Sequence, residues 1–406
     1  MSGNGRIVYI AGAGIAGMTL ALALAKFGAR VVVLERNTRV QEVGAGLQIS
    51  PNGRHALNQL GLEKALHAVA FEPEGIDVYP FGAKTPLVTL ELGPVMLERF
   101  GAPYVVMHRA DLAEVLYRAC KRFANIDMLF GVRAYDVVTH ARGVSVTVDE
   151  ADGKSRSARA FAFIGADGVN SRTRTEMLMG PKAEFSGRVA WRITLGQSDL
   201  PELFHPRRTS LLWGPGYHAV SYPLPHRRQV NVALFAKARA EEAFGAQGPR
   251  GPKLPRALFG RRRFDEILEA ARNDWGYWPL STVTTDRWVD GGIGLIGDAA
   301  HAMYPFQAQG AVMAIEDAAV LAPLLMTEPD AAAALVRYEK LRRPRVERVQ
   351  KLSKSNGFAF HLEWPFSLGR DMVVRMQGGR GHIERLGWLY GYDPAPDPTG
   401  VPLPPR

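Results

Sequence analysis

The sequence predicts a mixed α/β protein, and three observations carry that prediction. A strand-like segment, a glycine-rich turn and a helix-length apolar segment follow one another within the first 27 residues. Strand-like segments rich in aromatic residues occupy 183–284, and helix-length segments return after 326. We therefore expect a Rossmann-like domain, an inserted and mainly β domain, and C-terminal helices.

The composition is that of a globular protein large enough for two domains. The chain has 406 residues, of which 47% are hydrophobic and 22% charged, so a disordered chain is excluded. Its single cysteine, Cys120, rules out a disulfide within the chain and favours a reducing, cytoplasmic location. Glycines interrupt the N-terminal apolar segment, which therefore predicts a strand and a helix and no signal peptide or integral membrane segment.

The charge balance is basic, with 50 Lys and Arg against 40 Asp and Glu. Part of the excess lies at 249–264, where it is mixed with Pro and Gly, and we expect a solvated surface loop there and no nucleic-acid site. The overall excess favours the approach of a small carboxylate.

The elements expected in the first part follow from hydrophobic periodicity. A strand at 6–11, a helix at 15–27 and a strand at 29–36 form a β-α-β unit. The later expectations are a helix over 52–70, a mixed loop region to about 103, a strand and a helix over 104–123, and a hairpin over 132–148.

The expected domain limits follow from changes in this pattern. The proposed ranges are a nucleotide-binding domain at 1–182 and 285–325, a β-sheet substrate domain at 183–284, a helical region at 326–392 and a Pro-rich tail at 393–406.

The glycine-rich turn indicates a dinucleotide. Gly12, Gly14 and Gly17 form a GxGxxG pattern between a strand and a helix, where backbone N–H groups and the helix N-terminus attract a pyrophosphate. Glu35 ends the next strand, where its carboxylate can accept hydrogen bonds from ribose hydroxyls. It would repel a 2′-phosphate, so FAD or NAD suits the site better than NADP.

Two later segments resemble fingerprints of the flavin-dependent aromatic hydroxylases, the group A flavoprotein monooxygenases. They are "GADGVNSRTR" at 165–174 and "GLIGDAAHAMYPFQAQGAVMAIEDAAVL" at 294–321. Agreement extends over nearly the whole chain and is strongest with the salicylate hydroxylase branch, which includes 3-hydroxybenzoate 6-hydroxylases. The resemblance implies the fold of p-hydroxybenzoate hydroxylase, with FAD as the cofactor.

It also implies roles for individual residues. Asp298 would bind the ribityl chain, Arg109 would reach the phosphate-ribityl region, and Asp167 would form a turn near both FAD and the nicotinamide nucleotide. Free N–H groups at Gly310 and Ala311 can face the flavin C2 carbonyl. The full set expected at the cofactor is Gly12, Gly14, Ile15, Ala16, Gly17, Glu35, Arg36, Gly46, Leu47, Arg109, Asp167, Asp298, Pro305, Gly310, Ala311 and Val312.

The resemblance further implies the reaction. NADH or NADPH reduces FAD, and a flavin C4a-hydroperoxide then hydroxylates a small phenolic or hydroxypyridine carboxylic acid with oxygen from O2. A base near the substrate would help, because a phenolate is more nucleophilic than a phenol.

Candidates for this catalytic role and for contact with the substrate lie mainly on the β segment, and the catalytic candidates are His218, Tyr222 and Gln48. His218 and Tyr222 are four residues apart in "GYHAVSYPL", so they share one face of a strand, and family members carry a similar His-x-x-x-Tyr-Pro pattern. Gln48 is a second polar candidate. Arg192 is either a carboxylate ligand or a solvated or structural arginine, and Pro305 and Phe306 complete the set. We expect no metal site.

Two alternatives stay open. A flavin-dependent halogenase shares the fold, but "WGYWPL" at 275–280 matches that group's tryptophan signature poorly. A flavoprotein that binds a ligand without hydroxylating it is the other. We expect His301 and Asp317 to be structural. The sequence leaves open the aromatic substrate, NADH against NADPH, and monomer against homodimer.

Overall fold

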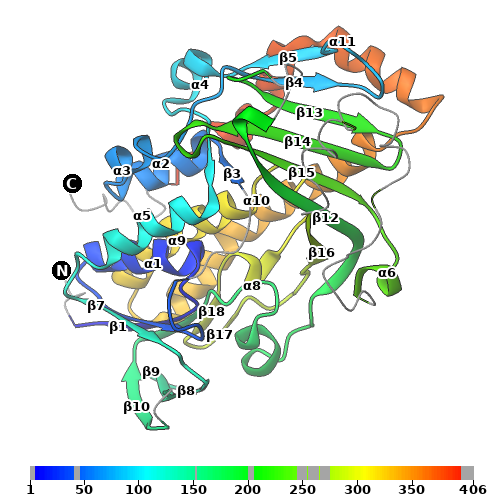
Figure 1. The fold of residues 1–406 in the computed structure, drawn as a ribbon. Coiled ribbons are helices and arrows are strands. Elements are labelled where there is room, and N and C mark those ends of the chain that lie inside the picture. Colours follow the sequence, from blue (N-terminus) through cyan, green and yellow to red (C-terminus); the bar gives the residue numbers. More distant parts are fainter. Residues whose placement is uncertain are drawn as a thin grey trace.

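Two large β-sheets organise the molecule (Figure 1). The computed structural model describes residues 5–40, 46–150, 153–199, 205–244, 254, 265 and 275–394. Most of the basic stretch at 249–264 and the tail from 395 lie outside these ranges, so the expectations for them are not addressed.

The first sheet has six strands, which are parallel except for an antiparallel strand at one edge. Its strands in spatial order are β17 (Val289–Asp290), β18 (Ile293–Leu295), β11 (Ala162–Gly165), β1 (Ile7–Ala11), β2 (Arg30–Glu35) and β7 (Ile126–Phe130). The strands β11, β18 and the centre of β2 are apolar runs buried on both faces, as a parallel sheet covered by helices requires. The expected β-α-β unit is present.

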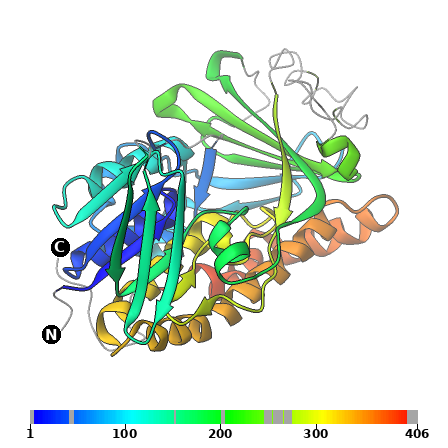
Figure 2. The same ribbon diagram turned by 90° about the horizontal axis from the view of Figure 1, so that it is seen from below.

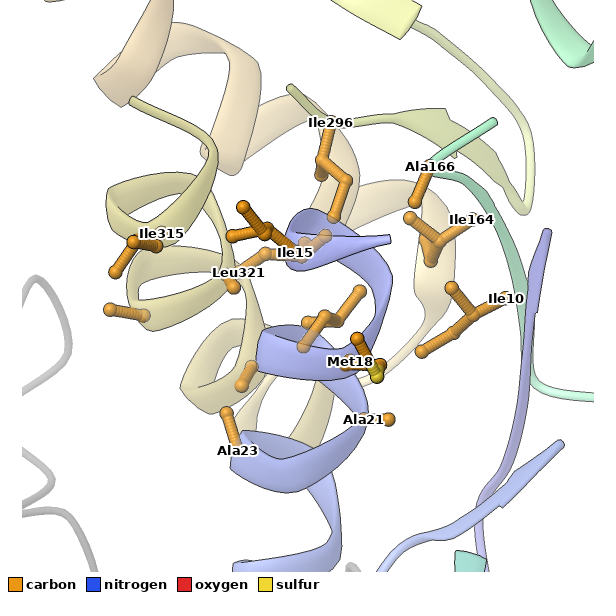
Figure 3. Packing of buried hydrophobic residues seen from close by; sticks show 14 of the residues in the cluster. Ile10, Ile15, Met18, Ala21, Ala23, Ile164, Ala166, Ile296, Ile315 and Leu321 are labelled. Atoms are coloured by element: carbon orange, nitrogen blue, oxygen red, sulfur yellow. The ribbon is translucent and has the colours of Figure 1, made fainter. Parts of the chain in front are cut away.

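Two helices that are apolar on nearly all sides pack together beside this sheet, and α1 (Ile15–Lys26) lies against its strand β2. Helix α1 packs against α9 (Gly310–Thr327), and Figure 3 shows Ile15 and Met18 of α1 between strand residues such as Ile10 and the α9 residues Ile315 and Leu321. Among the described residues, α9 is long and apolar enough to cross a membrane, but 83% of it is buried, as in the core helix of a folded domain.

The second sheet has seven strands and lies across helices α9 and α10 (Ala331–Phe360) from the first in the view of Figure 1. In spatial order it contains β16 (Gly276–Thr282), β12 (Glu184–Gly196), β15 (Gln229–Lys237), β14 (Tyr217–Leu224), β13 (Thr209–Gly214), β4 (Gly75–Tyr79) and β5 (Val88–Glu91). Five of these strands lie within the expected 183–284 range.

Strands β4 and β5 were not expected, because the sequence predicted mostly loop up to residue 103. They join the second sheet through parallel pairing of β4 with β13, more than 120 residues later in the chain. Residues 75–91 thus lie in the sheet assigned to 183–284, although the sequence placed them in the 1–182 range. Pairing over such a distance leaves no local signal.

Smaller elements complete the fold. Strands β8 (Ala134–His140), β9 (Gly143–Asp149) and β10 (Ser155–Ala160) form a separate antiparallel sheet beside the parallel one (Figure 2). The other short elements are β3 (Gly46–Ile49), β6 (Val105–His108), α2 (Pro51–Gln59), α3 (Glu63–His67), α4 (Gly93–Phe100), α5 (Arg109–Cys120), α6 (Ala240–Phe244) and α8 (Asp298–His301).

The C-terminal region is helical, as expected. Helix α10 packs along α9, α11 (Phe366–Arg385) contacts β5, and α12 (Gly387–Tyr390) follows. These helices close the space between the two sheets, which positions the candidate site.

Candidate functional site

A cavity of about 1700 Å³ lies between the two sheets and the helices α9, α10 and α11. Cavities that hold one small molecule usually measure about 300–1,000 Å³. This volume is therefore suited to a dinucleotide together with a second, smaller ligand.

The N-terminus of α1 forms one end of the cavity. Gly12, Gly14, Ile15 and Ala16 all line it, and the first turn of α1 has neither a side-chain cap nor an acidic residue. Gly12 has φ +104°, and a Cβ atom there would lie 2.5 Å from the carbonyl oxygen of Ala166. The free N–H groups of this turn are therefore open to an anion.

Gly17 does not line the cavity, although the sequence placed it among the cofactor contacts. A Cβ atom on Gly17 would overlap the carbonyl oxygen of Gly12. Gly17 therefore allows the helix to pack closely on the turn, which is the third glycine's role in this motif.

Glu35 lies at the end of β2 and lines the cavity. Its two carboxylate oxygens accept hydrogen bonds from the backbone N–H groups of Ala13 and Asn37, both at 2.9 Å. These bonds hold the carboxylate beside the glycine turn, and each oxygen keeps a lone pair for a ribose hydroxyl. Arg36 is exposed at the rim.

Asp167 holds a turn at the cavity wall. Its side chain accepts hydrogen bonds from Ser171 Oγ at 2.5 Å, from Tyr135 Oη at 2.9 Å and from both N–H and Oγ1 of Thr173 at 3.0 Å. These bonds fix the turn at Gly168, where φ is +76°. Asp167 thus shapes the wall through this turn, as an aspartate at the end of a strand commonly does.

Asp298 is exposed and lines the cavity at the start of α8. Behind it, Asp317 is fully buried and accepts hydrogen bonds from Gly297 N–H at 2.9 Å and from the His301 ring at 2.6 Å. Burial works against ionisation of Asp317, but His301, Arg342 and these hydrogen bonds lower its pKa to about 2. Asp317 and His301 therefore do not line the cavity. Through the bond from Gly297 N–H they hold the backbone next to Asp298.

The N-terminus of α9 also opens on the cavity. Gly310 and Ala311 line it, Pro305 lies just ahead, and a Cβ atom on Gly310 would meet nothing within 4 Å. The N-cap Gln309 makes no capping bond, since its amide contacts Ser50 and Asn52 instead. The first N–H groups of α9 are therefore free for an acceptor.

Val312, which was expected at the cofactor, does not line the cavity with its side chain. Its side chain is fully buried and packs toward Gly53 of α2, because the third residue of α9 already faces the core. The remaining expected cofactor residues that line the cavity are Gly46, Leu47 and Arg109.

The opposite end of the cavity is largely aromatic. His218 is buried, stacks on Phe235 with ring centroids 4.8 Å apart, and meets Phe306 edge-on at 4.9 Å. Tyr222 is also buried, so both residues face the cavity from β14 as the alternation of the strand predicts. Burial raises the pKa of Tyr222 above its usual value.

Tyr222 also fixes the strand β3. A Cβ atom on Gly46 would lie 2.5 Å from the Tyr222 ring, and Gly46 N–H donates to Asn231 Oδ1 at 2.8 Å. Gln48, two residues on, lines the cavity and accepts a hydrogen bond from Tyr104 Oη. Its amide group can therefore donate toward the cavity, but it has no proton-accepting nitrogen and cannot act as a base.

Arg192 lies on β12 and lines the cavity between the two ends. Its guanidinium lies 5.5 Å from the Trp278 ring centroid. Burial lowers the pKa of Arg192, Tyr222 raises it, and Arg109 lowers it further. Two cations beside one cavity make an anionic ligand favourable here, and a merely solvated arginine does not fit this position.

Sequence reasoning missed several residues that line the cavity. They were not among the expected site residues, and they are Tyr104, Trp213, Asn231, Phe235, Phe360 and Tyr390. Each reaches the cavity through sheet or helix packing.

Two other chemistries find no support in the described part of the chain. No group of three His, Cys, Asp or Glu side chains is placed to hold a metal. Cys120 is buried, its Sγ lies 3.5 Å from Met18 O, and burial raises its pKa to about 12, which makes it a poor nucleophile.

Comparison with known proteins agrees with this geometry. Residues 6–353 match the model of the FAD binding domain family. The chain is 34% identical to 3-amino-4-hydroxybenzoate 2-monooxygenase from Streptomyces platensis, over 96% of both chains. It is 30% identical to 3-hydroxybenzoate 6-hydroxylase 1 from Aquipseudomonas alcaligenes, over 95% of this chain and 97% of the relative.

A solved structure shares the fold. A variant of Klebsiella pneumoniae HpxO complexed with FAD superposes with a TM-score of 0.79 at 23% identity, covering 95% of this chain and 98% of the other. The glycine turn, the two free helix N-termini and the placement of Glu35 and Asp298 all fit this dinucleotide. The chain therefore belongs to the FAD binding domain family and is an FAD-dependent monooxygenase that uses NAD(P)H and O2.

Proposed function

We propose that this monooxygenase hydroxylates the ring of a small phenolic or hydroxypyridine carboxylic acid. The observation that carries the proposal is a single cavity lined both by the aromatic wall of His218 and Phe235 and by Arg192. An aromatic acid needs both features, because its ring is apolar and its carboxylate requires a cation. The relatives named above act on hydroxybenzoates, which supports the same substrate class.

The residues divide the work between two ligands. The α1 N-terminus, Glu35 and Asp298 would hold FAD, and the first N–H groups of α9 would face its ring. FAD supplies the oxygen chemistry once NAD(P)H has reduced it. Arg192 would bind the substrate carboxylate, while Phe235 and Phe306 would exclude water from the ring.

The remaining polar groups orient the substrate. Gln48, His218 and Tyr222 all line the cavity and can form hydrogen bonds to a ring hydroxyl. The proposed location is the cytoplasm, and the single cysteine of the chain supports a reducing location. The proposed assembly is a monomer or a homodimer.

The test is oxidation of NADH and of NADPH by the FAD-loaded protein with a panel of substrates. The panel contains salicylate, 3-hydroxybenzoate, 3-amino-4-hydroxybenzoate and 6-hydroxynicotinate, with phenol and benzamide as controls that lack a carboxylate. We expect at least one acid to accelerate oxidation and to yield a product one oxygen atom heavier by mass spectrometry. Incorporation of ¹⁸O from labelled O2 identifies the oxygen source.

Other outcomes separate the alternatives. Acceleration without any hydroxylated product would favour a flavoprotein that binds a ligand without hydroxylating it. A product that forms only with added chloride or bromide and contains the halogen would identify a halogenase. No response to any acid would refute the substrate class proposed here.

A further inference from the structure

A chain of three side chains begins at the half-buried Arg188 and ends at the aromatic wall of the cavity. Arg188 lies on β12, His361 directly follows α10, and His218 lies on β14. Arg188 Nη1 is 2.5 Å from His361 Nδ1, and His361 Nε2 is 2.7 Å from His218 Nδ1. Three segments far apart in the sequence thus form one continuous hydrogen-bonded chain.

The first member of this chain gives it a direction. A guanidinium can only donate hydrogen bonds, so His361 Nδ1 must be an acceptor without a proton. The proton of neutral His361 then lies on Nε2 and is donated to His218 Nδ1. His218 Nδ1 is therefore also an acceptor, and the proton of neutral His218 lies on Nε2.

His361 occupies Nδ1 of His218, which leaves Nε2 as the nitrogen available to a ligand in the cavity. His218 lines the cavity, and within the described residues its Nε2 has no protein partner. We propose that Arg188 and His361 are positioning residues that fix His218 as the Nε2–H tautomer, so that His218 donates a hydrogen bond to the substrate's ring oxygen and does not remove its proton. The substrate part of this proposal rests on the proposed function, whereas the tautomer does not.

The surroundings of the chain disfavour a charged imidazole at either position. His218 packs against Phe235, Phe306 and Phe360, and burial, together with His361 and Arg188, lowers its pKa well below the usual value. Burial, Arg188 and Lys237 lower the pKa of His361 to about 3. The charged groups that act on the pair are thus two cations, Arg188 and Lys237.

The same direction prevents His218 from acting as a base. To accept a proton on Nε2 while neutral, His218 would have to move its own proton to Nδ1, which already faces the donor Nε2–H of His361. Reversing His361 would place its proton on Nδ1, opposite the guanidinium of Arg188. A donor at Nε2 instead stabilises a phenolate oxygen, and the phenol proton leaves to solvent when the substrate binds.

The first experiment reads the tautomer directly. FAD-loaded protein labelled with ¹⁵N-histidine is studied by long-range ¹H–¹⁵N correlation, which distinguishes protonated from unprotonated ring nitrogens. His218→Asn and His361→Asn assign the two signals. We expect the proton on Nε2 of both rings in the wild type, and a proton on Nδ1 of His218 would overturn the proposal.

Substitutions of Arg188 test the cause. In Arg188→Glu the new carboxylate accepts a hydrogen bond from His361 Nδ1, and we expect the His218 proton to move to Nδ1. Arg188→Lys keeps a donor and should keep the wild-type pattern. Lys237→Met removes the other nearby cation without touching the chain, and it should also leave the pattern unchanged.

If Arg188→Glu does not fold, Arg188→Met serves in its place and should give a mixture of tautomers. The His218 proton could instead stay on Nε2 in every folded variant that lacks the Arg188 guanidinium. Arg188 would then not set the direction of the hydrogen bonds in this chain. That result would overturn the positioning roles.

The second experiment reads the effect on a bound phenol. A nitro-substituted hydroxybenzoate is titrated with pH in complex with the protein, because its phenolate absorbs visible light. In the wild type and in Arg188→Lys we expect the bound phenol to have a pKa about one unit lower than in Arg188→Glu. This is a roughly tenfold larger ionisation constant. Equal constants in the presence of the expected tautomers would overturn the hydrogen-bonding role of His218.

Failure of the probe to bind to any variant would count against the proposed substrate class. It would leave the tautomer measurement standing, so the two proposals fail separately.

Discussion

The buried ion pairs of Arg342 offer a test of how the cavity is supported. Arg342 is fully buried on α10, and its guanidinium lies 2.6 Å from Glu316 and 2.8 Å from Asp317 on α9. The same carboxylates hold Asn52 at 2.7 Å and Gly297 at 2.9 Å, next to Asp298. Arg342→Met keeps most of the side-chain volume but removes the charge.

The expected loss follows from the partners left behind. Removing one member of a buried ion pair costs about 3–5 kcal/mol, because a buried charge loses its compensation. Glu316 would keep Arg345 at 2.8 Å, and Asp317 would keep His301 at 2.6 Å. We therefore expect a loss near the lower end, about 3 kcal/mol of unfolding free energy.

The assay is urea unfolding at pH 7 with a fixed excess of FAD, followed by far-UV circular dichroism. Arg337→Met is the matched control on the same helix, because Arg337 forms an exposed pair with Glu328 at 2.6 Å that should contribute less than about 1 kcal/mol. In Arg342→Met, the further change Asp317→Asn removes one uncompensated carboxylate. The double variant should therefore lose less than the sum of the two single losses.

Equal losses in Arg342→Met and Arg337→Met would refute this reasoning. Strict additivity of Arg342→Met and Asp317→Asn would refute the coupling between the two residues.

Three further predictions concern the cofactor, the substrate and acid stability. Asp298→Ala should give largely colourless protein. The control is Asp290→Ala, which removes an exposed ion pair with Arg287 and should leave the protein yellow. Flavin absorbance after purification measures both, and equal flavin content would contradict the role of Asp298. Arg192→Met should raise KM for an aromatic acid at least about tenfold in the NAD(P)H assay, since a hydrogen bond to a charged group contributes about 1.5–3 kcal/mol. KM for the matching amide should change little, and a parallel rise for both would remove Arg192 from carboxylate binding. Asp317 has its pKa lowered to about 2 in the folded protein, so its contribution is complete above the unfolded value near 4 and is lost as the pH falls toward 2. Urea midpoints between pH 2 and 5 should therefore converge for wild type and Asp317→Asn as the pH falls, and a constant difference would contradict the shift.

The sequence predicted the elements that depend on local pattern. The GxGxxG turn, the first β-α-β unit and the long helix α10 all follow from periodicity and glycine spacing within about 30 residues. The facing of His218 and Tyr222 follows from the alternation of one strand, β14. The resemblance to flavoprotein hydroxylases added the cofactor and the reaction.

Tertiary contacts decided what the sequence could not. Strands β4 and β5 belong to the second sheet only because β4 pairs with β13, and Val312 turns into the core only because α2 packs on α9. Arg188 and His361 are 173 positions apart, yet their contact gives direction to the hydrogen bonds of His218. The sequence by itself determined which groups are present and how each lies on its own helix or strand. Which nitrogen of His218 carries the proton depends on packing between β12, β14 and the end of α10, because a proton's position is set by the neighbours that the fold supplies.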